Sequence, residues 1–166
     1  MEDLLHDLVA LLSQEAAEYR QLLTLLEDEE RALLAGESGR VAELTKRKET
    51  LALELKVLEE ARATLMSRLA AELAVPVESV TLTGLLDLAP ASVVPSLREL
   101  RDELSDLTRR LFETNRRNGF LLERSLAHVR GALALLTSLV TQQPTYEPTG
   151  RLFGSGSAVT IFDRRV

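Results

Sequence analysis

Apolar residues recur every three or four positions along the first half of the chain. In residues 4–34 these positions are Leu5, Leu8, Leu12, Tyr19, Leu22, Leu26 and Leu33, with Glu15 and Glu29 at the two remaining ones. After Gly36 and Gly39 the same spacing returns at Val41, Leu44, Lys48, Leu51, Leu55, Leu58, Arg62, Leu65 and Leu69. This heptad spacing is typical of helices that pack along a seam. It predicts helices at residues 3–35 and 39–74, which a short turn makes antiparallel.

The polar residues within the two seams predict how the helices are aligned. In an antiparallel hairpin, paired residues have numbers that add to a constant, and a sum of 77 places apolar residues opposite apolar ones throughout. The same sum places Glu29 opposite Lys48 and Glu15 opposite Arg62. A charge in an apolar seam is costly unless an opposite charge meets it. We therefore predict two ion pairs that set the register.

The next segment differs in composition and predicts a connector followed by a third long helix. Residues 75–94 contain Pro76 and Pro90 and favour a connector with one or two helical turns. Pro95 suits the first turn of a helix, and the apolar spacing extends that helix to residue 142. Its seam comprises Leu97, Leu100, Leu104, Leu107 and Leu111.

The seam of the third helix becomes polar in the middle. Steps of four and three residues from Leu111 reach Asn115 and Asn118. Two further steps of four lead to an apolar run at Leu122, Leu126, Val129, Leu133, Leu136 and Val140. A helix of this length spans about 70 Å, which is more than the hairpin needs for cover. We therefore expect one end of the helix to offer an uncovered apolar face.

These elements predict an all-α fold. A long coiled-coil-like hairpin and a third helix form an elongated bundle over residues 1–143, and residues 144–166 form a flexible tail. The composition agrees, because the chain has no Cys or Trp, 8 Gly, 4 Phe and 2 Tyr.

The distribution of charge excludes several classes of partner. The net charge is −6, and residues 1–36 alone hold nine acidic and two basic residues. Because the chain has no basic stripe, we expect no nucleic-acid partner. The amino terminus is acidic and no apolar run approaches 18 residues, so neither secretion nor membrane insertion is expected. These features predict a cytoplasmic protein.

The residues give little support for catalysis. The chain has two His, no Cys and no Gly-rich phosphate loop, so we expect no enzymatic activity, no metal and no cofactor. His128, followed by Val129, Arg130 and Gly131, is weakly similar to the phosphoacceptor site of helical phosphotransfer domains, but the spacing is one residue short.

Several segments in order resemble the FlgN-like flagellar export chaperones. The first is the acidic stretch Leu25-Leu26-Glu27-Asp28-Glu29-Glu30, which a Gly-containing turn follows. Lys48-Glu49 before Leu51 is the second, and Asn115-Arg116-Arg117-Asn118 before Leu121-Leu122 is the third. The last is the Tyr-x-x-x-Gly spacing of Tyr146 and Gly150.

The resemblance implies a binding protein without a cofactor. Members of this family hold the hook-filament junction subunits of the flagellum and deliver them to the export gate of a type III secretion apparatus. Carried over by position, the gate contact falls on Tyr146 and Gly150. The client contact falls on Asn115, Asn118, Leu121, Leu122 and Leu126.

Each assignment has a structural alternative. Asn115 and Asn118 are equally well explained as a polar layer that sets register within the bundle. Leu121, Leu122 and Leu126 are more typical of a bundle core than of an interface, because an apolar helix face is usually buried within its own domain. The rival function is a non-enzymatic coiled-coil adaptor or tether that acts through homodimerisation.

Overall fold

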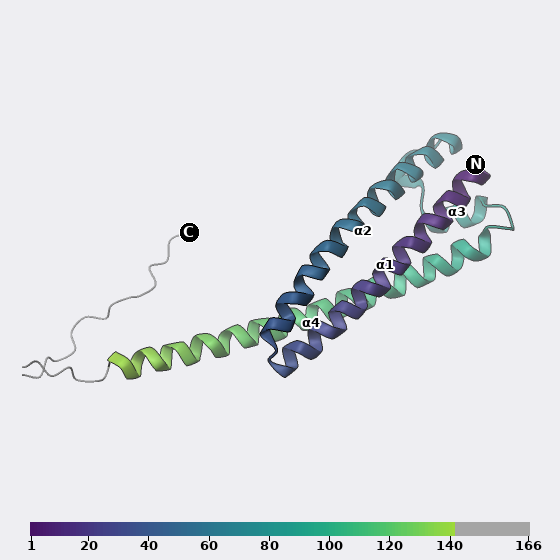
Figure 1. Cartoon of the computed structure of the whole chain (residues 1–166). Coiled ribbons are helices and arrows are strands. Elements are labelled where there is room, and N and C mark those ends of the chain that lie inside the picture. The colour runs from purple at the N-terminus through teal and green to yellow at the C-terminus, as the bar shows by residue number, and fades with distance from the viewer. Residues whose placement is uncertain (142–166) are drawn as a thin grey trace, which may run out of the picture. The chain divides into compact units, whose positions relative to one another are not determined.

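The computed structural model describes residues 1–141, and every regular element among them is helical (Figure 1). The elements in chain order are α1 (Glu2–Ala35), α2 (Ser38–Leu73), the 3₁₀ turn η1 (Val77–Ser79), α3 (Leu82–Leu88) and α4 (Val94–Thr141). The predicted all-α fold is confirmed, and each long helix begins and ends within one residue of its prediction. No helix in the described part of the chain has the length and apolarity needed to cross a membrane. The predicted tail, residues 144–166, lies outside the described residues.

The chain divides into two compact units, residues 1–122 and residues 123–166. The first unit contains α1, α2, the connector and the first part of α4. In the second unit the structure describes residues 123–141, which form the last part of α4.

A glycine ends α1 and reverses the chain. Gly36 has φ 72° and ψ 21°, a left-handed conformation that glycine adopts without a steric penalty. The backbone N–H of Glu37 donates to the carbonyl of Ala32 at 2.9 Å and satisfies one of the free carbonyls at the helix end. As a result α2 runs antiparallel to α1.

Both predicted ion pairs form and confirm the register of the hairpin. Lys48 Nζ lies 2.7 Å from the Glu29 carboxylate, and Arg62 Nε lies 2.9 Å from Glu15 Oε1. Each carboxylate is buried, whereas each basic partner keeps part of its side chain in water. The polar residues of the two seams therefore meet where the sum of 77 places them.

Leucine side chains fill the hairpin between and beyond these ion pairs. Towards the turn, the core consists of Leu25, Ala32, Leu44, Leu51 and Leu55. Towards the open end, it consists of Leu4, Leu5, Leu8, Leu12, Leu69, Leu85, Val93 and Leu97. The second cluster contains residues from α1, α2, α3 and α4 and from the link before α4, so it joins the whole first unit at that end.

The connector closes the open end of the hairpin. The hydroxyl of Thr81 accepts a hydrogen bond from the backbone N–H of Gly84 at 3.0 Å and caps α3. Leu85 of α3 is then 2% exposed and packs in the same cluster as Leu5 and Leu69. The connector holds the single 3₁₀ turn η1 and the seven-residue α3, which is more helix than the one or two turns expected. Burial of Leu85 and Val93 anchors the segment from which α4 begins.

Helix α4 runs parallel to α1 within the first unit. Arg20 lies 2.6 Å from Glu103, and Arg110 lies 3.4 Å from Glu27. Both pairs join residues 83 positions apart, and a constant difference in number means that the two helices run in the same direction. Ala16 and Leu23 of α1 pack with Leu107 in this interface.

The buried seam of α4 departs from the expected one at one position. Thr114 is 4% exposed and Asn118 is 1% exposed, whereas Asn115 is exposed. The seam thus continues from Leu111 by steps of three and four residues, through Thr114 to Asn118. The expected step from Leu111 to Asn115 is wrong, because a side chain there lies about 100° around the helix from Thr114.

Candidate functional site

A polar junction joins the three long helices. Asn118 Nδ2 on α4 donates to Glu29 Oε2 on α1 at 2.9 Å, and also to the carbonyl of Leu26 at 2.8 Å. The same carboxylate accepts from Lys48 on α2. Buried polar groups need such partners, since an unpaired one costs about 1–3 kcal/mol. Asn118 therefore lies inside the bundle, although its Oδ1 has no protein partner among the described residues.

The second polar layer, the ion pair of Glu15 with Arg62, lies near Tyr19. Burial is the main cause that raises the pKa of the Tyr19 hydroxyl, and the negative charges of Glu59 and Glu15 raise it further. Glu15 is 2% exposed and receives the hydrogen bond from Arg62. The polar side chains of both layers therefore pair with one another inside the bundle, and residues that could bind a partner have to be sought on its surface.

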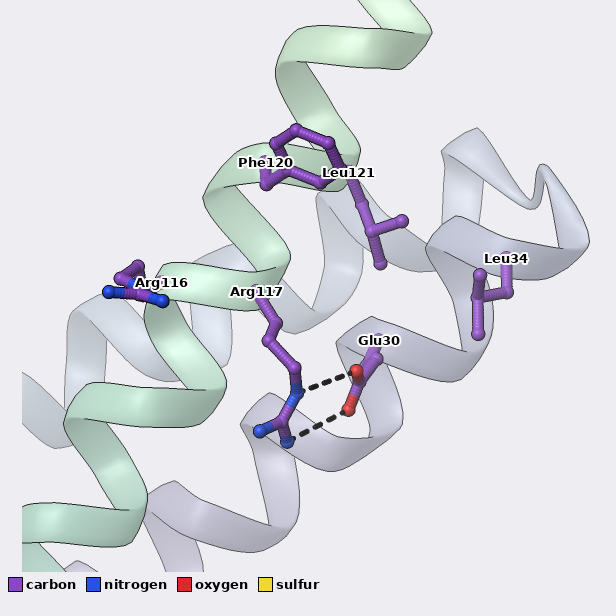
Figure 2. A pocket seen from close by; sticks show the side chains of 6 residues that line it. All are labelled: Glu30, Leu34, Arg116, Arg117, Phe120 and Leu121. Atoms are coloured by element: carbon purple, nitrogen blue, oxygen red, sulfur yellow. Dashed lines mark hydrogen bonds and ion pairs between the residues drawn. The ribbon is translucent and has the colours of Figure 1, made fainter.

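A hollow of about 520 Å³ opens on the surface between α1 and α4, within the first unit (Figure 2). Its lining residues are Glu30, Leu34, Arg116, Arg117, Phe120 and Leu121. Arg117 donates to both carboxylate oxygens of Glu30, at 3.0 and 3.4 Å, and this ion pair closes one side. The pair and the Glu113 and Glu27 charges hold the Arg117 pKa above its ordinary value.

Large apolar side chains of the hollow are in contact with water. Leu34 is 70% exposed and Phe120 is 59% exposed, while Leu121 is half-buried. Grouped apolar exposure of this kind marks binding surfaces, whereas isolated exposed leucines are ordinary. The hollow therefore offers an apolar surface with Arg116 and Arg117 beside it.

A second apolar surface follows α4 through residues 123–141. Leu126, Val129, Leu133 and Leu136 are 53%, 57%, 55% and 59% exposed. Their spacing of three and four residues places them on one face of the helix. We call these four residues the apolar stripe. The uncovered apolar face expected for α4 is thus present in the described residues, and a partner helix could bury it.

The structure separates the predicted client-binding residues. Asn118 belongs to the polar junction, Leu121 lines the hollow, and Leu126 belongs to the apolar stripe. Leu122 is 38% exposed and Asn115 is exposed. Tyr146 and Gly150, the predicted gate contacts, lie outside the described residues.

Leu34 and Phe120 were not among the predicted site residues. Both fall outside the heptad seams, and in a helical bundle an apolar residue outside the seam is a sequence feature that indicates surface exposure. Their proximity depends on the packing of α1 against α4, which links residues far apart in the sequence. Among residues 1–141, no group of three or more His, Asp and Glu side chains is placed to hold a metal ion.

These features define a class of protein: a helical bundle whose polar layers are used internally and whose surface offers apolar helix faces to a partner. The family model described as FlgN protein matches residues 1–152. The chain therefore belongs to the FlgN family, whose members are chaperones of flagellar export. No curated protein and no solved structure matched the chain.

Proposed function

We propose that this protein is a cytoplasmic chaperone of the flagellar type III export apparatus. It binds the terminal amphipathic helices of hook-filament junction subunits, prevents their premature assembly and delivers them to the export gate. Membership of the FlgN family supports the general role. The observation that carries the binding step is the apolar stripe of α4.

The stripe suits an amphipathic helix as its ligand. Its four side chains are each more than half exposed and share one helix face. Burying the rest of each side chain against a client contributes about 1 kcal/mol, since full burial of a leucine or valine contributes about 1.5–3 kcal/mol. Association itself has a large entropic cost, so the client must contact further residues. Leu121, Leu122 and Asn115 are the nearest predicted contacts in sequence.

Calorimetric titration tests the binding step. The probes are the isolated terminal helical segments of the junction subunits from the same bacterium, and the chaperone is the full chain. We expect dissociation constants near micromolar, about −8 kcal/mol, with a negative heat-capacity change. Leu126→Glu places a charge in the stripe and should remove binding. Leu53→Glu is the matched control, because Leu53 is 68% exposed on α2.

Absence of binding by the folded full chain would refute the client proposal. Equal loss in the Leu126→Glu and Leu53→Glu variants would show that the stripe is not the binding surface. Circular dichroism of each variant establishes that the helices are intact.

Delivery is proposed to depend on the Tyr146 region. A Tyr146→Ala variant should bind client segments with unchanged affinity and yet export less junction subunit from cells. Reduced calorimetric affinity in this variant would instead place Tyr146 in client binding. Normal export would remove Tyr146 from the proposed gate contact.

Homodimerisation is the second candidate function, because the heptad spacing of the apolar stripe also suits a second copy. Sedimentation equilibrium of the protein alone and mixed with the client segments decides between them. A tether predicts a dimer that Leu126→Glu dissociates, together with no client binding. The chaperone proposal predicts that client segments bind to the stripe and displace any self-association.

A further inference from the structure

Arg116 differs from the other arginines around it. Arg109 pairs with Asp106 and Glu113, Arg110 pairs with Glu27, and Arg117 pairs with Glu30. Arg116 is exposed and has no ion pair among the described residues. It lines the hollow, so one positive charge there is available for a partner.

The apolar part of the hollow lies beside this charge. Leu34, Phe120 and Leu121 line the hollow, and Arg116 lines it on the side away from Leu34, with Arg117 between them (Figure 2). A ligand that fits both features carries a bulky apolar side chain and a carboxylate close together. A basic segment would instead meet Arg116 with like charge, because Glu30 already balances the charge of Arg117.

Helix α1 already shows how an acidic helix meets this part of α4. Glu30 pairs with Arg117, and Leu34, four residues later on the same face of α1, lines the hollow. The carboxylate and the leucine are thus presented one helical turn apart. A bound helix with the same spacing could place a carboxylate against Arg116, as α1 places Glu30 against Arg117.

We propose that the hollow binds an acidic helical segment of the client, with a carboxylate paired to Arg116 and a large apolar side chain one turn away against Leu34 and Phe120. This inference rests on the proposed function, since the client is its ligand. It deepens that function by assigning a charge requirement to the client. The hollow thereby distinguishes acidic amphipathic helices from basic ones of equal hydrophobicity.

Charge reversal tests the proposed ion pair. The full chain is titrated with the client segments as an Arg116→Glu variant and as a matched Arg98→Glu control. Arg98 is also exposed on α4 without an ion pair among the described residues, and it does not line the hollow. We expect Arg116→Glu to weaken binding about three- to tenfold. Arg98→Glu should leave the affinity unchanged.

The client side supplies the complementary half of the experiment. Each Asp or Glu of the segment is changed in turn to Lys, and the segments are titrated against wild-type chaperone and Arg116→Glu. One such change should weaken binding to the wild type and recover most of the loss in Arg116→Glu. Recovery identifies the paired carboxylate, because a general change of net charge would not depend on position.

A second pair of variants tests the apolar side of the hollow. Phe120→Ala should weaken binding, whereas Phe112→Ala should not, since Phe112 is 70% exposed on α4 but does not line the hollow. Circular dichroism of both variants shows whether the helix is retained. Equal affinities for Phe120→Ala and Phe112→Ala would overturn the assignment of the hollow.

The outcomes separate this inference from the proposed function. If Leu126→Glu abolishes binding while Arg116→Glu and Arg98→Glu behave alike, the chaperone proposal stands and the inference is wrong. If wild-type chaperone binds no client segment, the proposed function fails, and the inference is overturned with it because its ligand is the client. If Arg116→Glu changes only self-association of the chaperone, the occupant is a second copy and the inference is likewise overturned.

Discussion

Removing Lys48 should destabilise the bundle far more than removing a surface base. Lys48→Ala leaves the Glu29 carboxylate, 2% exposed, with Asn118 as its remaining side-chain donor. Loss of one partner from a buried ion pair costs about 3–5 kcal/mol. The Lys48 side chain is 21% exposed, so water can reach the vacated space, and we expect the lower end of this range, about 3 kcal/mol.

Urea denaturation followed by circular dichroism at 222 nm measures this cost. The matched control is Arg40→Ala, whose pair with Glu43 joins side chains that are 42% and 57% exposed. An exposed pair contributes about 0–1 kcal/mol, so the control should remain close to wild type. The dependence of unfolding free energy on urea should stay the same in both variants, because the exposed surface on unfolding hardly changes.

Replacing all three side chains of the polar junction should not lower the stability, in contrast to removing Lys48 alone. With Glu29, Lys48 and Asn118 all changed to Leu, no buried polar group is left unpaired, and the bundle should be at least as stable as wild type. If Lys48→Ala costs no more than Arg40→Ala, the junction does not carry the energetic role argued here. A triple-leucine variant less stable than Lys48→Ala would also refute the reasoning.

Three further predictions concern single residues and the chain end. Folding raises the pKa of Tyr19, so the contribution of Tyr19 to the free energy of unfolding is fully present below the unfolded pKa near 10 and is lost as the pH rises through the folded pKa. Urea titrations should therefore show that the Tyr19→Phe variant loses less stability than wild type between pH 9 and 11. Gly36→Ala should destabilise by about 1 kcal/mol, and Ala74→Gly should stabilise by up to about 1 kcal/mol, because both positions have positive φ; thermal unfolding measures both, and shifts of the same sign would contradict this. A chain ending at Thr141 should keep its helical circular dichroism, and a large loss would show that the removed residues support the core.

Much of the hairpin could be predicted from the sequence because its determinants are local and periodic. Heptad spacing defines two helices, and Gly36 marks where the first must end. The polar residues Glu15 and Glu29 select the register because each needs an opposite charge. All of these follow from the order of residues along two adjacent segments.

Predictions for α4 were less complete because its neighbours are distant in the sequence. The choice between Thr114 and Asn115 at the seam depends on how α4 is rotated against α1. Spacing alone permits a step of three or four residues there. Burial of Asn118 against Glu29, 89 residues away, resolved that choice.

The sequence by itself determined the all-helical class, the three long helices and the pairing of α1 with α2, since periodicity and charge pairing act over short distances. Only the tertiary structure decided that Asn118 is internal and that Leu34, Arg116 and Phe120 line one hollow. That surface arises from parallel packing of α1 and α4, and packing of remote segments depends on the connector and on Leu85 and Val93 in the shared core. The sequence identified the family and the amphipathic helix, and the fold determined which apolar side chains of the described residues are exposed.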